Sequence, residues 1–220
     1  MFANLSISQK LYAGFGVVLL IILILVSSTW RGFSEVDSTV KRNIHTYDVI
    51  NESADLLASL INIETGMRGF VITGREQFLA PLTEGEHAFQ EHFATLRNLT
   101  ADNPAQQQRL NQLLSAHDQW MREDIDSNVE LRRKVSAGSQ PIEAVIEQVS
   151  AGRDKAKMDG MRLLLKDLQA EESALLEQRS ASMQSAKSSS LVILLLGGLV
   201  AVVLALSVAF VLSRSCLLYT

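Results

Sequence analysis

The 220-residue chain carries 24 acidic and 20 basic residues, and every acidic residue lies between Glu35 and Glu177. Two long uncharged stretches, Leu11–Ser28 and Leu191–Leu212, flank this charged middle. The pattern excludes an ordinary water-soluble protein and indicates an integral membrane protein with one soluble domain on a single face of the bilayer. The only cysteine, Cys216, follows the second stretch, so we expect no disulfide in the soluble domain.

The first uncharged stretch predicts a transmembrane helix over residues 11–29, preceded by a short cytoplasmic N-terminus at residues 1–10. A helix rises about 1.5 Å per residue, so the two stretches reach about 27 and 33 Å, enough to cross a bilayer core. A cleaved signal peptide is the alternative. No small-x-small cleavage site follows the apolar run, however, because Ser27–Thr29 lead directly into Trp30-Arg31. We therefore expect an uncleaved signal anchor.

Charge predicts the orientation of the two spans. An even number of spans places both termini on one side, where Lys10 and Arg214 are the basic residues. Positive charge near a span favours the cytoplasmic side. We therefore expect a bacterial inner-membrane protein in contact with lipid through two spans, residues 11–29 and 191–212, with residues 30–188 periplasmic or extracellular.

The soluble middle is predicted to be helical. The chain has only three prolines, and its apolar residues recur three, four and seven positions apart, which is typical of helices that pack in bundles. The four predicted core stripes are Val36, Val40, Tyr47, Ile50, Ala54, Leu57 and Ile61; Phe78, Leu82, Phe89, Phe93 and Leu96; Leu110, Leu114, His117, Met121, Asn128, Leu131 and Val135; and Met158, Met161, Leu165, Leu168 and Leu175. The predicted fold is all-α: an extracytoplasmic antiparallel four-helix bundle whose first and last helices continue into the two transmembrane helices.

Turn residues predict where the first two helices meet. The first helix should stop around Thr73 and Gly74, with Thr73 and Glu76 spaced as a capping box for the second helix. Because of Pro81, the regular structure of the second helix is expected to begin only near Ala80.

Two further breaks contain proline. Ala101–Pro104 offers a cap and then proline at the first position of the third helix, and Ala137–Pro141 is expected to do the same for the fourth. The fourth helix should run almost continuously through residues 141–212. We interpret it as the element that transmits a signal.

Residues 64–81 carry a motif, Glu-Thr-Gly-Met-Arg-Gly-Phe-Val-Ile-Thr-Gly-Arg-Glu-Gln-Phe-Leu-Ala-Pro. It resembles the signature of the third class of CHASE domain, an extracellular sensory module of bacterial receptors. The matching positions are Glu64, Thr65, Gly66, Arg68, Gly69, Phe70, Thr73, Gly74, Phe78 and Leu79. The last predicted helix also resembles the family, at Lys157–Asp159, Arg162, Glu171-Glu172 and Leu175-Leu176. The similarity covers most of residues 35–180 and implies a sensory domain.

The N-terminus adds a second resemblance. Asn4–Leu11 followed by Gly14–Gly16 is similar to the opening of methyl-accepting chemotaxis receptors and of some sensor histidine kinases. Such receptors act as homodimers and normally continue past the second span. The resemblance therefore implies a homodimer whose downstream signalling partners bind a cytoplasmic region beyond Arg214.

Residues 213–220 are expected to be a truncated cytoplasmic stub. Ser213–Ser215 is an ordinary exit from a membrane helix, but one reading frame of a common sequencing adapter encodes the same five residues as Cys216–Thr220. We hypothesise that residues 216–220 are artefactual and that a native cytoplasmic portion is missing. Genomic sequence that encodes these five residues and then a stop codon would refute this.

Glu64 and Arg68 are the charged residues of the motif. Their spacing of four places the carboxylate beside the guanidinium on a helix. One interpretation is a structural ion pair, with Gly66 and Gly69 letting a neighbouring helix approach closely. The other is that Arg68 also faces a pocket and pairs with an anionic ligand.

The four histidines do not indicate a metal site. His87 and His92 are five residues apart, about 140° round a helix, so they cannot chelate one ion together. His117 lies on an apolar stripe and is expected to be a core residue. His92 and Trp120 are candidates for lining a ligand pocket, with plain packing as the alternative for Trp120.

The sequence shows no nucleophile elbow, no glycine-rich phosphate loop and no catalytic carboxylate pair, and Arg132–Lys134 is a short basic run at a helix end. We therefore expect no enzyme, no cofactor and no nucleic-acid partner. The predicted function is the input half of a bacterial transmembrane signal receptor, a methyl-accepting chemotaxis protein, that senses a small-molecule or protein ligand. The alternatives are the input region of a sensor histidine kinase or cyclase, and a membrane-tethered structural bundle that senses nothing.

Overall fold

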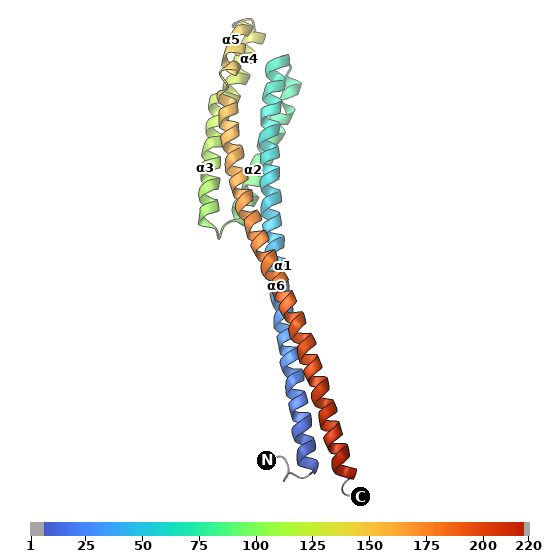
Figure 1. The fold of residues 1–220 in the computed structure, drawn as a ribbon. Helices are drawn as coiled ribbons and strands as arrows, with labels where there is room; N and C mark the ends of the chain where they lie inside the picture. The colour runs from blue at the N-terminus through green and yellow to red at the C-terminus, as the bar shows by residue number, and fades with distance from the viewer. Residues whose placement is uncertain (1–6, 218–220) are drawn as a thin grey trace. The chain divides into compact units, whose positions relative to one another are not determined.

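The computed structural model describes residues 7–217, with the side chains of residues 8, 9 and 11–210. Within this range the chain consists of helices joined by short turns and has no β-strand (Figure 1). The elements are α1 (Ile7–Thr73), a 3₁₀ turn η2 (Glu76–Leu79), α2 (Ala80–Leu99), α3 (Pro104–Trp120), a π-helical turn η3 (Met121–Ile125), α4 (Asp126–Ser136), α5 (Ile142–Ser150) and α6 (Arg153–Leu217). The predicted all-α class is confirmed. The hypotheses about residues 1–6, residues 218–220 and the side chains of Lys10, Arg214 and Cys216 lie outside the described part.

The chain divides into two compact units. The first, Asn43–Leu176, we call the helical domain; the second, Met1–Arg42 with Glu177–Thr220, we call the two-helix unit. Helices α1 and α6 contribute a segment to each.

One apolar core fills the helical domain. It is built from Val49, Leu56, Leu60, Ile63, Met67 and Phe70 of α1, Phe89, Phe93 and Leu96 of α2, Leu110, Leu113 and Trp120 of α3, Met121 and Ile125 of η3, Val129 of α4, and Met158, Met161, Leu165 and Leu168 of α6. The predicted stripes of the second and fourth helices lie largely on this core. Phe78 is an exception at 37% exposure, because it belongs to η2 and precedes the second helix.

The predicted core stripe of the first helix is wrong by about one position. Val40, Tyr47 and Ile61 are 43%, 56% and 41% exposed. The buried row includes Ser53 and Ser59 instead, whose hydroxyls donate to the carbonyls of Ile50 and Asp55 within the same helix. A serine that satisfies its hydroxyl in this way can be buried, so hydropathy alone selected the wrong face.

The π-helical turn η3 changes which residues of the third predicted stripe face the core. A π turn accommodates one extra residue and rotates the side chains that follow. Met121 and Asn128 are buried as predicted, but Ile125 and Val129 take the core positions, and Leu131 is only partly buried.

The helix expected to run almost continuously through residues 141–212 is divided into α5 and α6. Gly152 has a φ of 67° and separates α5 from α6. Its N–H donates to the carbonyl of Val149 at 3.1 Å, which closes the end of α5. Glycine is favoured at this position because other residues strain in the left-handed region.

The first helix stops where the sequence predicts. Gly74 has a φ of 68°, and its N–H donates to the carbonyl of Phe70 at 2.7 Å. The capping box is wrong, because Thr73 Oγ1 accepts from the N–H of Arg75 and the Glu76 carboxylate pairs with Arg133. Helix α2 then begins at Ala80, as predicted.

The two proline-containing breaks differ. Asn103 Oδ1 accepts from the N–H groups of Ala105 and Gln106 at 3.1 and 3.2 Å, so the predicted cap of α3 is confirmed. Pro141 itself is the N-cap residue of α5, and no side chain caps this end. The expected repeat of the cap-then-proline arrangement is therefore wrong.

In the two-helix unit, segments of α1 and α6 approach closely at glycines. A Cβ atom at Gly14 would lie 2.7 Å from Val208, and one at Gly197 would lie 2.5 Å from Leu25. Small residues permit such approaches between apolar helices. Most large apolar side chains point away from the contact; Leu23 is 66% exposed. The helical stretches Leu11–Thr73 and Ile142–Phe210 each contain an 18-residue window long and apolar enough to cross a membrane, by length and composition.

Candidate functional site

The motif segment forms the last turns of α1 and the turn after it. Helical periodicity directs Glu64, Met67 and Phe70 to the same side as the apolar core, where they are 8%, 0% and 1% exposed. Thr65 points to solvent. A carboxylate is thus placed at the edge of an otherwise apolar face.

Two arginines hold the Glu64 carboxylate. Oε1 lies 2.8 Å from Nη2 of Arg68, one turn along α1, and Oε2 lies 3.3 Å from Nη2 of Arg162 on α6. The Glu64 side chain is 10% exposed, whereas those of the arginines are 48% and 41% exposed. A nearly buried carboxylate requires partners of this kind, because an unpaired buried charge is costly.

Asp154 extends the contacts to the first turn of α6. Its buried carboxylate lies 3.4 Å from Nη2 of Arg68. Glu64, Arg68, Asp154 and Arg162 together form what we call the α1–α6 ion network. An anionic ligand at Arg68 would have to compete with two carboxylates of the chain, so the geometry favours the structural interpretation of this arginine.

The motif glycines lie against the neighbouring helix to different degrees. A Cβ at Gly66 would be 2.4 Å from the backbone nitrogen of Leu82, whereas one at Gly69 would be 3.3 Å from the ring of Phe78. On α2, a Cβ at Gly85 would be 2.8 Å from a backbone carbonyl oxygen of α1. Backbone atoms cannot move aside as a side chain can. The closest approach of α1 and α2 is therefore at Gly66 and Gly85.

Helix α4 binds the end of the motif. The guanidinium of Arg133 lies 5.7 Å from the centre of the buried Phe70 ring, within cation–π range. Arg132 Nε donates to the carbonyl of Val71 at 2.9 Å. A Cβ at Gly74 would overlap only the Arg132 guanidinium, the mobile end of a long side chain, so it is the positive φ of Gly74 that favours glycine here.

The three candidate ligand contacts do not meet in one site. Trp120 is fully buried in the core. His92 bonds to Glu52, whereas Arg68 bonds to Glu64. Glu52 and Arg68 lie on the same helix, about 24 Å apart along its axis.

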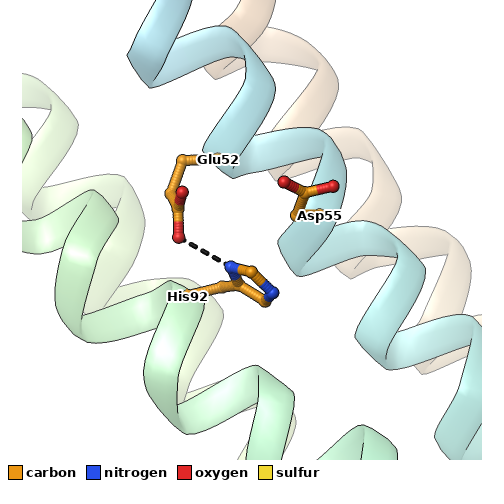
Figure 2. Close-up of side chains that lie close together, drawn as sticks. All are labelled: Glu52, Asp55 and His92. Carbon is orange, nitrogen blue, oxygen red and sulfur yellow. Dashed lines mark hydrogen bonds and ion pairs between the residues drawn. The ribbon is translucent and has the colours of Figure 1, made fainter.

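His92 belongs to a second polar cluster, shown in Figure 2. Its Nδ1 lies 2.7 Å from Oε1 of Glu52 on α1, and Asp55 lies beside them on the same helix. One ligand atom from each of the three side chains lies within 4.8 Å of the other two. Among the described residues, this cluster has the side chains and spacing to hold a metal ion.

The core contains buried polar groups near the π-helical turn. The His117 ring stacks on Phe89, with centroids 3.7 Å apart and planes inclined by 6°. The pKa of His117 lies below its ordinary value because burial disfavours the charged imidazole. The nearby Asp118 and Glu86 carboxylates act in the opposite direction but do not outweigh burial. Asp124 is also buried, and its carboxylate lies 2.8 Å from Nζ of Lys157.

Asp154, Glu52 and Asp55 were not predicted as site residues from the sequence, and Arg162 was predicted only as a family match. A signal for Asp154 was present: Gly152 is typical of a helix end, and an acidic side chain is favoured in the first turn of the helix that follows. Nothing in the sequence pairs Glu52 with His92, because the contact depends on how α1 and α2 pack.

Comparison with known proteins places the chain in a family. No curated protein and no solved structure matches it. The family model of the CHASE3 domain matches residues 39–182, more than half of the chain, and this range contains the motif, the α1–α6 ion network and the whole helical domain. CHASE3 domains are extracellular-type sensory domains found in receptors and histidine kinases. The resemblance seen in the sequence is confirmed, and this chain belongs to the CHASE3 domain family.

Proposed function

We propose that this chain is the input half of a bacterial transmembrane signal receptor, a methyl-accepting chemotaxis protein, and that it acts without catalysis. In this proposal the helical domain is an antiparallel four-helix bundle on the outer side of the cytoplasmic membrane. Its first and last helices, α1 and α6, continue into the bilayer. A small molecule or a protein in the periplasm is the cue.

The α1–α6 ion network is the observation that carries this proposal. It joins, through Glu64, Arg68, Asp154 and Arg162, the two helices that also contain windows of membrane-crossing length. A cue that changed the packing of these helices would change this network. Packed interfaces have discrete arrangements, so relative shifts of about 1–2 Å are sufficient to transmit a signal. The cue must favour one arrangement by about 1–3 kcal/mol.

An exposed apolar row on α1 supports a homodimer. Tyr47 and Ile61 are 56% and 41% exposed, and Ile44 is 55% exposed. With Ala54, which is also exposed, Tyr47 and Ile61 follow a spacing of seven residues. This repeat is the seam of a two-helix coiled coil. We assign this face to the second copy of the chain, and Tyr47→Cys is expected to cross-link copies in membranes while the solvent-facing Ser136→Cys is not.

A hybrid receptor tests the function. Residues 1–215 are joined to the cytoplasmic region of a chemoreceptor, in a strain without other receptors, and kinase output is measured. We expect output from the hybrid, and a shift of at least about threefold when Arg162→Ala removes one partner of Glu64. Lys134→Ala is the matched control, because it breaks an exposed pair with Glu130 within α4. Equal output from all three hybrids, at equal abundance, would favour a structural bundle.

Two other functions remain alternatives to a chemoreceptor. If the native output region is a histidine kinase or a cyclase, the same domain is the input region of that enzyme. Genomic sequence beyond the codon for Ser215 separates these: long glutamine- and glutamate-rich helices support the chemoreceptor, and a phosphoacceptor-histidine helix supports the kinase.

A further inference from the structure

The cluster of Glu52, Asp55 and His92 has the ligand chemistry of a divalent transition-metal site. Carboxylate oxygens and imidazole nitrogens bind Zn²⁺ at about 2.0–2.2 Å, usually in tetrahedral geometry. Those distances place two ligand atoms about 3.4 Å apart. The ligand atoms here lie within 4.8 Å of one another, so side-chain rotations are enough to bring them onto one ion.

The three side chains are arranged for ion capture. Glu52 and Asp55 are three residues apart on α1, and this spacing places both on one side of the helix. The side chains of Glu52 and His92 are 19% and 29% exposed and are held by their mutual hydrogen bond. Asp55 is exposed. Two ligands are therefore fixed on different helices, and the third can close on an ion that enters from solvent (Figure 2).

The hydrogen bond between Glu52 and His92 does not include Asp55. Neither carboxylate forms an ion pair with a lysine or an arginine among the described side chains. A divalent cation can bind all three side chains, and imidazole favours the Zn²⁺ class over Mg²⁺ or Ca²⁺.

We propose that Glu52, Asp55 and His92 form a binding site for a divalent transition-metal ion of the Zn²⁺ class, with water completing the coordination, and that the ion ties α1 to α2. This proposal differs from the expectation of no metal site, which considered only whether His87 and His92 could bind one ion from the same helix. The partners of His92 lie on a helix forty positions earlier in the chain. The proposal stands independently of the signalling function.

The test is calorimetric titration of the full chain with Zn²⁺. The protein is purified in detergent without a tag and treated with chelator, and it carries Cys216→Ser to remove the only thiol. We expect one Zn²⁺ per chain, and weakening of at least about tenfold in Asp55→Asn and in His92→Gln. His87→Gln is the matched control, because it removes an exposed histidine of the same helix and should leave binding unchanged. Mg²⁺ is expected not to compete.

A second measurement guards against loss of folding in the variants. Asp55 is exposed, so Asp55→Asn should melt like the parent without metal. When Zn²⁺ is added, the parent and His87→Gln should gain thermal stability, and Asp55→Asn should gain much less. Co²⁺ should give a visible absorption band in the parent that is lost in His92→Gln. The proposal is overturned if the parent binds no Zn²⁺, or if the Asp55→Asn and His92→Gln variants bind it as tightly as His87→Gln.

Discussion

The helical domain and the two-helix unit place the same kind of residue in opposite environments. In the helical domain Leu56 and Leu60 of α1 are fully buried against protein. In the two-helix unit Leu23 of α1 and Leu195 of α6 are 66% and 74% exposed. Large contiguous apolar surfaces are rare on water-soluble proteins. The difference teaches that α1 and α6 are each matched to two surroundings, a packed protein core and the bilayer of the proposed function.

Polar groups follow the same division. The helical domain places Glu64, Asp124 and Asp154 in its interior, and each lies next to a basic side chain. The apolar windows of the two-helix unit hold few charged residues, as a hydrocarbon environment demands. The helical domain is therefore specified by packing and ion pairs, and the two-helix unit by composition.

The largest expected effect comes from Gly66→Val, which sharpens the account of packing in the helical domain. A Cβ there overlaps the backbone of α2, so we expect a loss of more than about 3 kcal/mol in unfolding free energy, or no folded domain. Trp120 fluorescence in a Trp30→Phe background, followed through urea unfolding, reports on this domain alone. Gly160→Ala is the control: nothing lies within 4 Å of its Cβ, and it should stabilise the helix by up to about 1 kcal/mol. Equal stability of the two variants would contradict the close approach.

The comparison of leucines gives the next largest effect. Leu56→Ala leaves a cavity in the core and should cost about 2–5 kcal/mol. Leu23→Ala removes an outward-facing side chain and should change the urea midpoint of the helical domain by less than the equivalent of about 0.5 kcal/mol. Trp120 fluorescence during urea unfolding measures the effect of both substitutions on the stability of the helical domain. If Leu23→Ala were as damaging as Leu56→Ala, the division into a packed domain and an outward-facing apolar unit would be broken.

A smaller effect is expected in the α1–α6 ion network. Arg162→Met removes one partner of the nearly buried Glu64 and should cost about 1–2 kcal/mol, less than a fully buried pair because the arginine is partly exposed. Changing Glu64→Gln in the same chain should recover part of this loss. A double-mutant cycle that shows no coupling between positions 64 and 162 would remove the network from the account.

The smallest effect is a pH dependence from His117. Burial lowers its pKa below the ordinary value of 6.5, so the unfolded chain binds a proton at pH values where the folded chain does not. Stability is full above about pH 6.5 and falls as the pH drops below it. We expect lower unfolding free energy at pH 5.5 than at pH 7.5, and a smaller difference in His117→Gln. Glu76, whose pKa is lowered by Arg133, loses its contribution only below its ordinary value of 4.5, so it does not interfere.

Much of the fold could be predicted because it depends on local signals. Gly74, Asn103 and the start of α2 at Ala80 were all found from turn chemistry, and the stripe from Met158 to Leu168 was found from periodicity. The break at Gly152 was missed because a single glycine between two stretches of helix-forming residues gives a weak signal. The face of α1 was misplaced because buried serines look polar in sequence although their hydroxyls are satisfied.

The candidate site was less predictable than the fold. The pair Glu64–Arg68 follows from spacing along one helix, and it is present at 2.8 Å. Arg162 and Asp154 join it only because α6 packs beside this part of α1, and the Glu52–His92 contact likewise depends on the packing of α2. Contacts between residues far apart in sequence require the tertiary structure, which one sequence does not supply.

The central claim is that the helical domain is an extracytoplasmic sensor. The most direct test is to determine on which side of the membrane this domain lies. Ser139→Cys, an exposed position in the turn before α5, is introduced in a Cys216→Ser chain and treated with a membrane-impermeant maleimide in intact spheroplasts. We predict labelling of this cysteine before lysis, and labelling of Cys216 in the parent chain only after lysis. Labelling of both positions only after lysis would place the helical domain in the cytoplasm and contradict an extracytoplasmic sensor.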